Sequence, residues 1–83
     1  MAMDRYLIAS PHTAEECAAV VRQVNAAGFI THMDWGCKDH DHTGWTIVEA
    51  DSHEEAKMMV PSILRPSAHV VRVVKYSPSD FNE

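Results

Sequence analysis

Two elements can be recognised in the first third of the chain from its pattern of apolar and polar residues. Residues 5–10 form a short apolar run with strand character, which the Pro-His pair that follows brings to an end. Thr13 and Glu16 have the spacing of a capping box, in which each side chain bonds the backbone N–H of the other, so we expect a helix to start there. Apolar residues recur at helical spacing up to Val24, and Gly28 is the expected end of that helix.

The rest of the chain predicts two strands, a second helix and a last strand. Apolar and polar residues alternate over 29–35 and over 45–50, which is typical of strands with two different faces. Ser52 begins a second capping box, and the helix that follows is interrupted at Pro61, where we expect a kink or a restart. Residues 68–76 form a Val-rich run that is apolar on both faces, which indicates a strand covered on both sides.

The predicted order of strand, helix, strand, strand, helix and strand indicates an α+β fold of the ferredoxin-like βαββαβ class. In that fold an antiparallel four-stranded sheet carries both helices on one face. We expect a single domain over residues 1–83, with a loosely attached polar tail over 76–83. The other face of the sheet stays open and would carry Ile30 and Val48, so we expect a homodimer that pairs two open faces.

Composition and charge exclude several classes of partner. The 83 residues carry 12 acidic and 7 basic side chains, which gives a formal charge of -5, whereas binding to nucleic acid needs a basic face. No segment has the apolar length of a signal peptide or a membrane span, so we expect a cytoplasmic protein without a membrane partner. In that reducing compartment Cys17 and Cys37 are expected to be thiols, with a disulfide between them as the less favoured alternative.

Two phrases of the sequence resemble a known superfamily. Trp35-Gly36 stands before the central hairpin, and residues 44–51 read Gly-Trp-Thr-Ile-Val-Glu-Ala-Asp, ahead of an acidic helix start and a Val-rich last strand. In length, order of elements and these phrases the chain is similar to the dimeric α/β-barrel superfamily, and more narrowly to its short bacterial members of uncharacterised function. The resemblance implies one dimeric domain with a pocket between sheet and helices. Members include cofactor-free monooxygenases, isomerases and haem-handling proteins, but no catalytic motif of theirs is present here.

The segment between the two tryptophans is nearly a mirror of itself about His40 and holds the clearest candidate chemistry. Cys37, His40 and His42 supply one thiol and two imidazoles at short spacing, and zinc, copper or nickel accepts such ligands. A tight turn at His40 would place Cys37 on one face and both histidines on the other. If Gly36 and Gly44 were instead hinges of a longer loop, the three ligands could converge on a divalent transition metal. We favour the hinged loop, because neither glycine stands where a tight turn requires one.

The expected topology brings further reactive side chains to the same end of the sheet. The first strand ends where the hairpin turns back and the last strand starts, so His12, the first turn of the first helix and His69 should lie near the hairpin. His12 is therefore a further candidate ligand. His12 and His42 are also the candidates for a catalytic general base, with Asp39 or Asp41 orienting the imidazole.

A pocket for a small ligand would have three candidate residues, Trp35, Trp45 and Cys17. Each also fits a purely structural role. Tryptophan rings commonly pack at the edge of a core, and Cys17 lies on the apolar stripe of the first helix, as a buried structural thiol would.

Three classes of function remain open from the sequence. The first is a small dimeric binding module that holds a metal ion or a small organic ligand at the hairpin end. The second is a cofactor-free enzyme of the isomerase or monooxygenase type with a histidine base, so whether the chain is an enzyme stays undecided. The third is a structural or regulatory dimer without a small-molecule site. The clustered cysteines and histidines favour the first.

Overall fold

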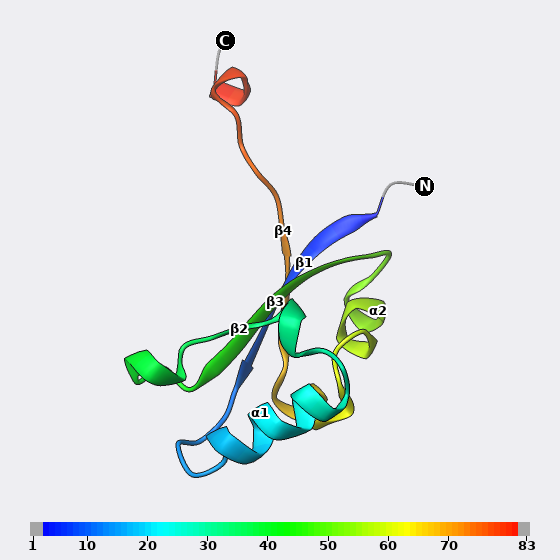
Figure 1. The fold of residues 1–83 in the computed structure, drawn as a ribbon. Coiled ribbons are helices and arrows are strands. Elements are labelled where there is room, and N and C mark those ends of the chain that lie inside the picture. The colour runs from blue at the N-terminus through cyan, green and yellow to red at the C-terminus, as the bar shows by residue number, and fades with distance from the viewer. Residues whose placement is uncertain (1–2, 82–83) are drawn as a thin grey trace.

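A computed structural model describes residues 3–81 of the chain, and Figure 1 shows how its elements are arranged. Six helices and strands follow one another in the order β, α, β, β, α, β. In sequence they are β1 (Asp4–Pro11), α1 (Cys17–Ala26), β2 (Asp34–Trp35), β3 (Thr43–Ala50), α2 (His53–Met58) and β4 (His69–Val73). Four short 3-10 helices connect or follow them: η1 (Ile30–His32), η2 (Cys37–Asp39), η3 (Ser62–Ser67) and η4 (Pro78–Phe81). No helix of these residues is long and apolar enough to cross a membrane.

The four strands form one sheet in the order β2-β3-β1-β4, and every neighbouring pair is antiparallel. β1 is central: it pairs with β3 from Asp4↔Ala50 to Pro11↔Thr43, and with β4 from Arg5↔Val73 onward. The prediction of a small α+β domain with a four-stranded antiparallel sheet is therefore confirmed.

The core lies between the sheet and the two helices. Alternate residues of β1, among them Tyr6 and Ile8, are buried against Val24 of α1 and Ala56 of α2. Because α1 and α2 belong to one buried cluster with the same face of β1, both helices cover that face. No helix or strand among residues 3–81 covers the opposite face of the sheet.

The prediction of which side chains occupy the open face was wrong. Val48 lies opposite Tyr6 in the β1–β3 register and packs against the core, so it points to the helices. Its neighbour Ile47 occupies the open face instead and is 51% exposed. Alternation fixed which residues share a face, but both faces of β3 carry apolar side chains, so the pattern did not distinguish inside from outside.

The strand expected over 29–35 is reduced to the two residues of β2, and Ile30 lies in η1. The hydroxyl of Thr46 donates a 2.6 Å hydrogen bond to the carbonyl of His32, which holds η1 against β3. The carbonyl of His32 therefore accepts from a side chain, whereas in a regular strand it would accept from a backbone N–H of the neighbouring strand. The alternation of apolar and polar residues over 29–35 is also compatible with a short turn whose two ends pack against the core, because the segment is too short to distinguish the two.

The last strand is shorter and more exposed than expected. It ends at Val73, opposite Arg5, close to the point where β1 itself begins. β4 is an edge strand, and Val71 on its open side is 39% exposed. The expectation of a strand covered on both sides is therefore wrong for β4 in this chain.

The first capping box forms as predicted, whereas the second forms only in part, because the Glu55 carboxylate accepts from the N–H of Asp51 at 3.4 Å and not from that of Ser52. The N–H of Glu16 donates to the Thr13 hydroxyl at 3.2 Å, and the N–H of Thr13 donates to the Glu16 carboxylate at 3.0 Å. The α-helix proper nevertheless starts at Cys17, three residues after Ala14, where a helix capped by Thr13 would begin. Ser52 accepts from the N–H of Glu55 at 3.1 Å and starts α2. Pro61, with an extended ψ of 147°, separates α2 from η3.

Replacing Ser52 by Ala is expected to lower the free energy of unfolding by about 1 kcal/mol, because the N–H of Glu55 loses its acceptor. Urea unfolding followed by circular dichroism measures the change. Ser62→Ala is the matched control, because Ser62 is exposed and opens η3 without a side-chain cap. Equal stability of the two variants would contradict the role of Ser52.

Candidate functional site

Each tryptophan of the hairpin lies against the glycine of the opposite strand. Trp35 pairs with Gly44, and a Cβ built on Gly44 would come within 2.8 Å of the Trp35 ring. A Cβ on Gly36 would come within 2.9 Å of the Trp45 ring and 2.6 Å of the Asp41 carbonyl oxygen. The near-mirror order of Trp35, Gly36, Gly44 and Trp45 in the sequence therefore corresponds to two reciprocal contacts, each between a tryptophan ring and a glycine.

Our expectation that these glycines are hinges was wrong. Neither has a positive φ, and both are required because a ring or a carbonyl occupies the space of a side chain. The left-handed residue of the loop is His40, with φ 65°. A tight turn centred on His40 would place Trp35 opposite Trp45, whereas in the structure Trp45 lies opposite Asp34.

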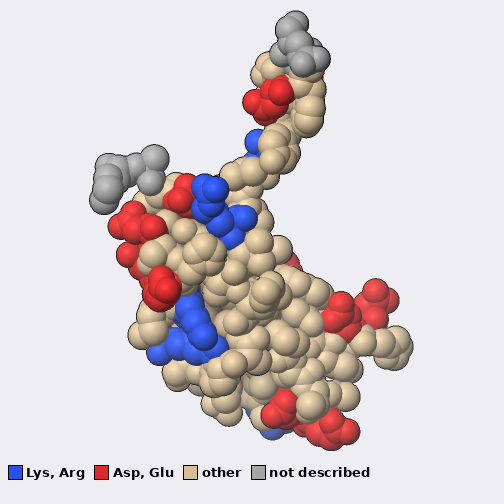
Figure 2. Space-filling model, turned by 180° about the vertical axis from the view of Figure 1, so that it is seen from behind, with Lys and Arg blue, Asp and Glu red and all other residues tan. Residues whose placement is uncertain are grey.

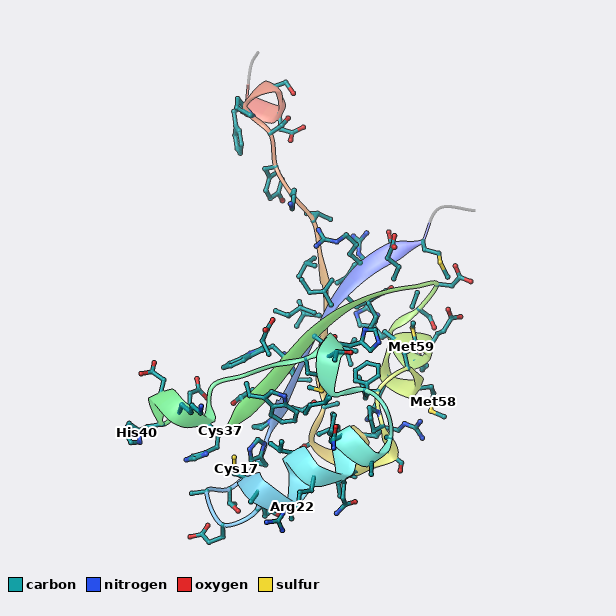
Figure 3. All side chains as sticks on the ribbon, in the orientation of Figure 1. Cys17, Arg22, Cys37, His40, Met58 and Met59 are labelled. Atoms are coloured by element: carbon teal, nitrogen blue, oxygen red, sulfur yellow. The ribbon has the colours of Figure 1, made fainter. Side chains whose placement is uncertain are left out.

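The loop closes on its own backbone. The N–H groups of Asp39 and Asp41 both donate to the carbonyl of Gly36, and the N–H of Gly36 donates to Thr43. This path separates the three predicted metal ligands. His40 lies at the outer end of the hairpin, away from the body, while Cys37 lies close to Cys17 at the start of α1 (Figure 3).

Four side chains come together where the loop meets α1. The ligand atoms of His12, Cys17, Cys37 and His42 all lie within 4.8 Å of one another, and all four residues are half-buried. The Cys37 thiol lies 3.4 Å from Nε2 of His12, and the ring centroids of His12 and His42 are 6.1 Å apart. We call these four residues the Cys2His2 cluster.

Three separate parts of the fold position the cluster. His12 follows β1 and is held by its N–H, which donates to the carbonyl of His42 at 2.9 Å. Cys17 is the first residue of α1, placed by the capping box before it. Cys37 and His42 stand at the two ends of the closed hairpin loop.

The cluster favours the protonated form of the Cys37 thiol as long as no cation is bound. Burial, together with the neighbouring Cys17 thiol, raises the pKa of Cys37 from 9.0 to about 11. Nδ1 of His42 is buried and has no hydrogen-bond partner among the described residues. A buried nitrogen left without a partner is costly, and a bound cation would use its lone pair.

The donor set matches the preferences of zinc. Bond lengths of about 2.3 Å to sulfur and about 2.0 Å to nitrogen place the ligand atoms of a tetrahedral site roughly 3.3 to 3.8 Å apart. The largest separation in the cluster is within 4.8 Å, so small side-chain rotations would bring all four atoms to that spacing. Two thiols and two imidazoles form the S2N2 set that typically binds zinc.

The structure brings together some of the predicted site residues and separates others. Of the predicted metal ligands, Cys37 and His42 are in the cluster, and His40 is exposed outside it. His12, the further candidate ligand, is included. Cys17 was assigned to a ligand pocket or the core, and the signal that could have placed it here is its position in the first turn of a helix that starts beside the hairpin.

Other residues that were predicted to belong to the site lie outside the Cys2His2 cluster or do not contact its histidines. His69 lies opposite Ala9, at the expected end of the sheet, but lines a shallow hollow with His53 and is not part of the cluster. Among the described residues, neither Asp39 nor Asp41 has a carboxylate bonded to a histidine, and Asp41 accepts from the Thr43 hydroxyl instead. The predicted orientation of a histidine base by these carboxylates is not present.

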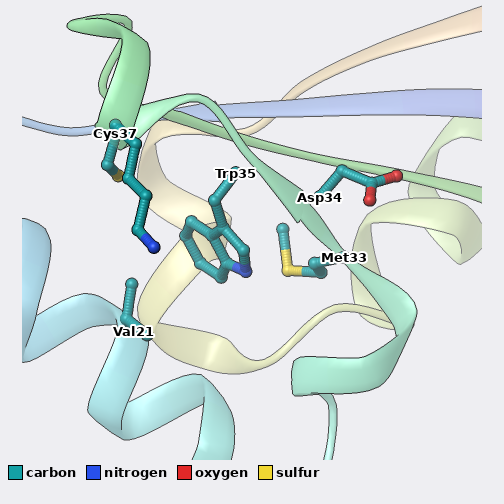
Figure 4. Close-up of a pocket in the computed structure, with 6 residues that line it drawn as sticks. Val21, Met33, Asp34, Trp35 and Cys37 are labelled. Atoms are coloured by element: carbon teal, nitrogen blue, oxygen red, sulfur yellow. The ribbon is translucent and has the colours of Figure 1, made fainter.

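A pocket of about 360 Å³ lies between α1 and the hairpin, next to the cluster (Figure 4). Its walls are mostly apolar: Val21, Met33, Asp34, Trp35, Cys37 and Lys38. Trp35 is the one predicted pocket residue that lines it. Trp45 lies in a hollow of the open face with Leu7 and Ile47, and Cys17 belongs to the Cys2His2 cluster.

No protein-family model, no curated protein and no solved structure matches this chain. The resemblance to the dimeric α/β-barrel superfamily therefore stays a prediction.

Proposed function

We propose that the chain is a small metal-binding protein whose Cys2His2 cluster holds one zinc ion. The observation that carries this proposal is the convergence of two thiols and two imidazoles, with all four ligand atoms within 4.8 Å of one another. These residues come from positions 12, 17, 37 and 42, so the fold assembles them and not local sequence alone. Incidental surface histidines would not be expected to meet the chain's two cysteines half-buried in one place.

The proposed role of the ion is structural. Four protein ligands complete a tetrahedral shell, whereas catalytic zinc sites keep one position for water or substrate. The ion would join the end of β1, the first residue of α1 and the hairpin loop. The backbone hydrogen bond from the N–H of His12 to the carbonyl of His42 already links the first of these to the loop, and the ion would add α1. Zinc would thus fix the loop on the body.

Two other predictions from the sequence, the fold class and the cellular location, are compatible with this proposal. The strand order and antiparallel pairing support a ferredoxin-like sandwich. Two thiols available as ligands suit a cytoplasmic protein, where cysteines stay reduced.

The alternative of a cofactor-free isomerase or monooxygenase is less favoured. Its candidate bases, His12 and His42, both belong to the cluster, and an imidazole that ligates zinc cannot take a proton at the same nitrogen. The superfamily resemblance is its only support.

Isothermal titration of the metal-free protein with zinc chloride is expected to show one site per chain, with protons released as the thiols become thiolates. Cys17→Ser should lose this binding. That variant separates the cluster from the ligand set expected from sequence spacing, which did not contain Cys17.

The matched control is His40→Asn, since Asn tolerates the left-handed backbone that His40 adopts. It should bind zinc as the wild type does. If Cys17→Ser keeps full affinity while His40→Asn loses it, the ion is held by the hairpin alone and the proposal is wrong.

A further inference from the structure

The C-terminal segment leaves the body of the molecule as an arm. β4 ends at Val73, and residues 74–81, which we call the arm, extend away from the sheet (Figure 1). The radius of gyration is 14.7 Å, whereas a compact chain of this length would have about 12 Å. The arm nevertheless exposes large apolar side chains: Val74 is 58%, Tyr76 74% and Phe81 72% exposed.

The tip of the arm has its own local structure. The carboxylate of Asp80 accepts from the N–H of Ser77 at 2.7 Å, and the N–H of Asp80 donates to the carbonyl of Ser77. This turn brings the rings of Tyr76 and Phe81 together, with centroids 5.9 Å apart. An aromatic pair held in this way would lose little conformational freedom on binding a surface.

The open face of the sheet is a matching apolar surface. Its central row runs across three strands as Ile47, Leu7 and Val71, and Trp45 and Ala9 continue it in the next row. Ile47 and Val71 are 51% and 39% exposed. Seen from behind, the body carries its acidic side chains mainly toward the edges (Figure 2).

We propose that the arm of one copy packs across the open face of a second copy, and that the second copy's arm packs on the first. Residues 74–77 extended span about 13 Å, and a sheet of four strands is about 14 Å wide. The arm can therefore carry its aromatic pair across a partner's sheet. Apolar rings buried on an apolar face provide the driving force.

A second copy is favoured over another partner because this chain supplies both halves of the contact. In a two-fold symmetric dimer, both arms and both open sheet faces are buried together. The row at the end of the open face sets Glu49 beside Arg5, so it adds no net charge that would oppose the approach of a chain with formal charge -5. The interface lies on the side of the sheet opposite the helices and does not involve the Cys2His2 cluster.

Light scattering after gel filtration, at micromolar concentration, tests whether two copies pack their arms on each other's open faces. The wild type is expected to be a dimer. The double variant Tyr76→Ser, Phe81→Ser removes the aromatic pair without touching the core, and should raise the dimer dissociation constant by at least about tenfold. Ile47→Lys on the open face should do the same, and Met58→Ser, at an exposed position of α2, should not.

A mixture of the two defective variants gives the decisive result. In a heterodimer, the intact arm of the Ile47→Lys protein meets the unchanged open face of the double variant, so one of the two contacts is retained. A homodimer of either variant retains neither contact in its intact form. The mixture should therefore associate more tightly than either variant alone. A monomeric wild type, a double variant that dimerises as the wild type does, or a mixture no tighter than its components would each overturn the proposal. Circular dichroism verifies that Ile47→Lys is folded.

Discussion

Zinc at a free concentration a thousandfold above its dissociation constant is expected to raise the free energy of unfolding by about 4 kcal/mol. The ion would bind with full affinity only to the folded chain, because the four proposed ligands meet only when β1, α1 and the hairpin are assembled. For a domain of this size each kcal/mol moves the melting temperature by about 4–8 °C. The shift is therefore on the order of 20 °C, larger than any single side-chain contact in the chain would give.

Differential scanning calorimetry with zinc and with a chelator measures this difference. The stabilisation should disappear in Cys37→Ser and persist in His40→Asn. It should also decrease as the pH falls, because zinc must displace the proton from the Cys37 thiol, whose pKa is about 11 without metal. A melting temperature that zinc leaves unchanged would rule out a structural role for the ion.

Replacing Gly36 by Ala is expected to cost about 1–3 kcal/mol, because the new methyl group would overpack the hairpin. Its nearest neighbour would be the Asp41 backbone oxygen at 2.6 Å, and backbone cannot rotate aside. Gly44→Ala should cost less, since one of its close neighbours is the terminal methyl of Met33, which can move. Both variants should weaken zinc binding, because the glycines fix the loop that carries Cys37 and His42.

Urea unfolding of the metal-free variants gives the two costs, and zinc titration gives the effect on the loop. Gly28→Ala is the control: its Cβ would contact nothing, but its φ of 76° makes Ala unfavourable. It should lower stability and leave zinc affinity unchanged. A Gly36→Ala protein that matches the wild type in both measurements would mean that the hairpin can adopt another path.

Local signals in the sequence predicted local structure well. The capping box at Thr13, the N-cap at Ser52 and the left-handed Gly28 depend on bonds between residues a few positions apart, so their spacing alone identifies them. The path of the hairpin could not be predicted in this way. Its register depends on two rings that each need a glycine across the strand pair, which is a contact between strands.

The same distinction explains the candidate site. Cys37 and His42 were found because they stand in one short segment. His40 was included by that spacing, yet its left-handed backbone turns it outward. Cys17 was missed because it is 20 positions from Cys37 in the sequence, and only the packing of α1 against the hairpin brings the two thiols together.

The reciprocal stacking of the tryptophans on glycines has an optical consequence. Trp35 points to the helices and lies 5.9 Å from the ring of His12, while Trp45 stands on the open face beside Ile47. The protein's two indole fluorophores thus report on two separate surfaces. With Trp45 replaced by Phe, emission would follow the occupancy of the Cys2His2 cluster, and with Trp35 replaced by Phe it would follow the arrival of a partner's arm.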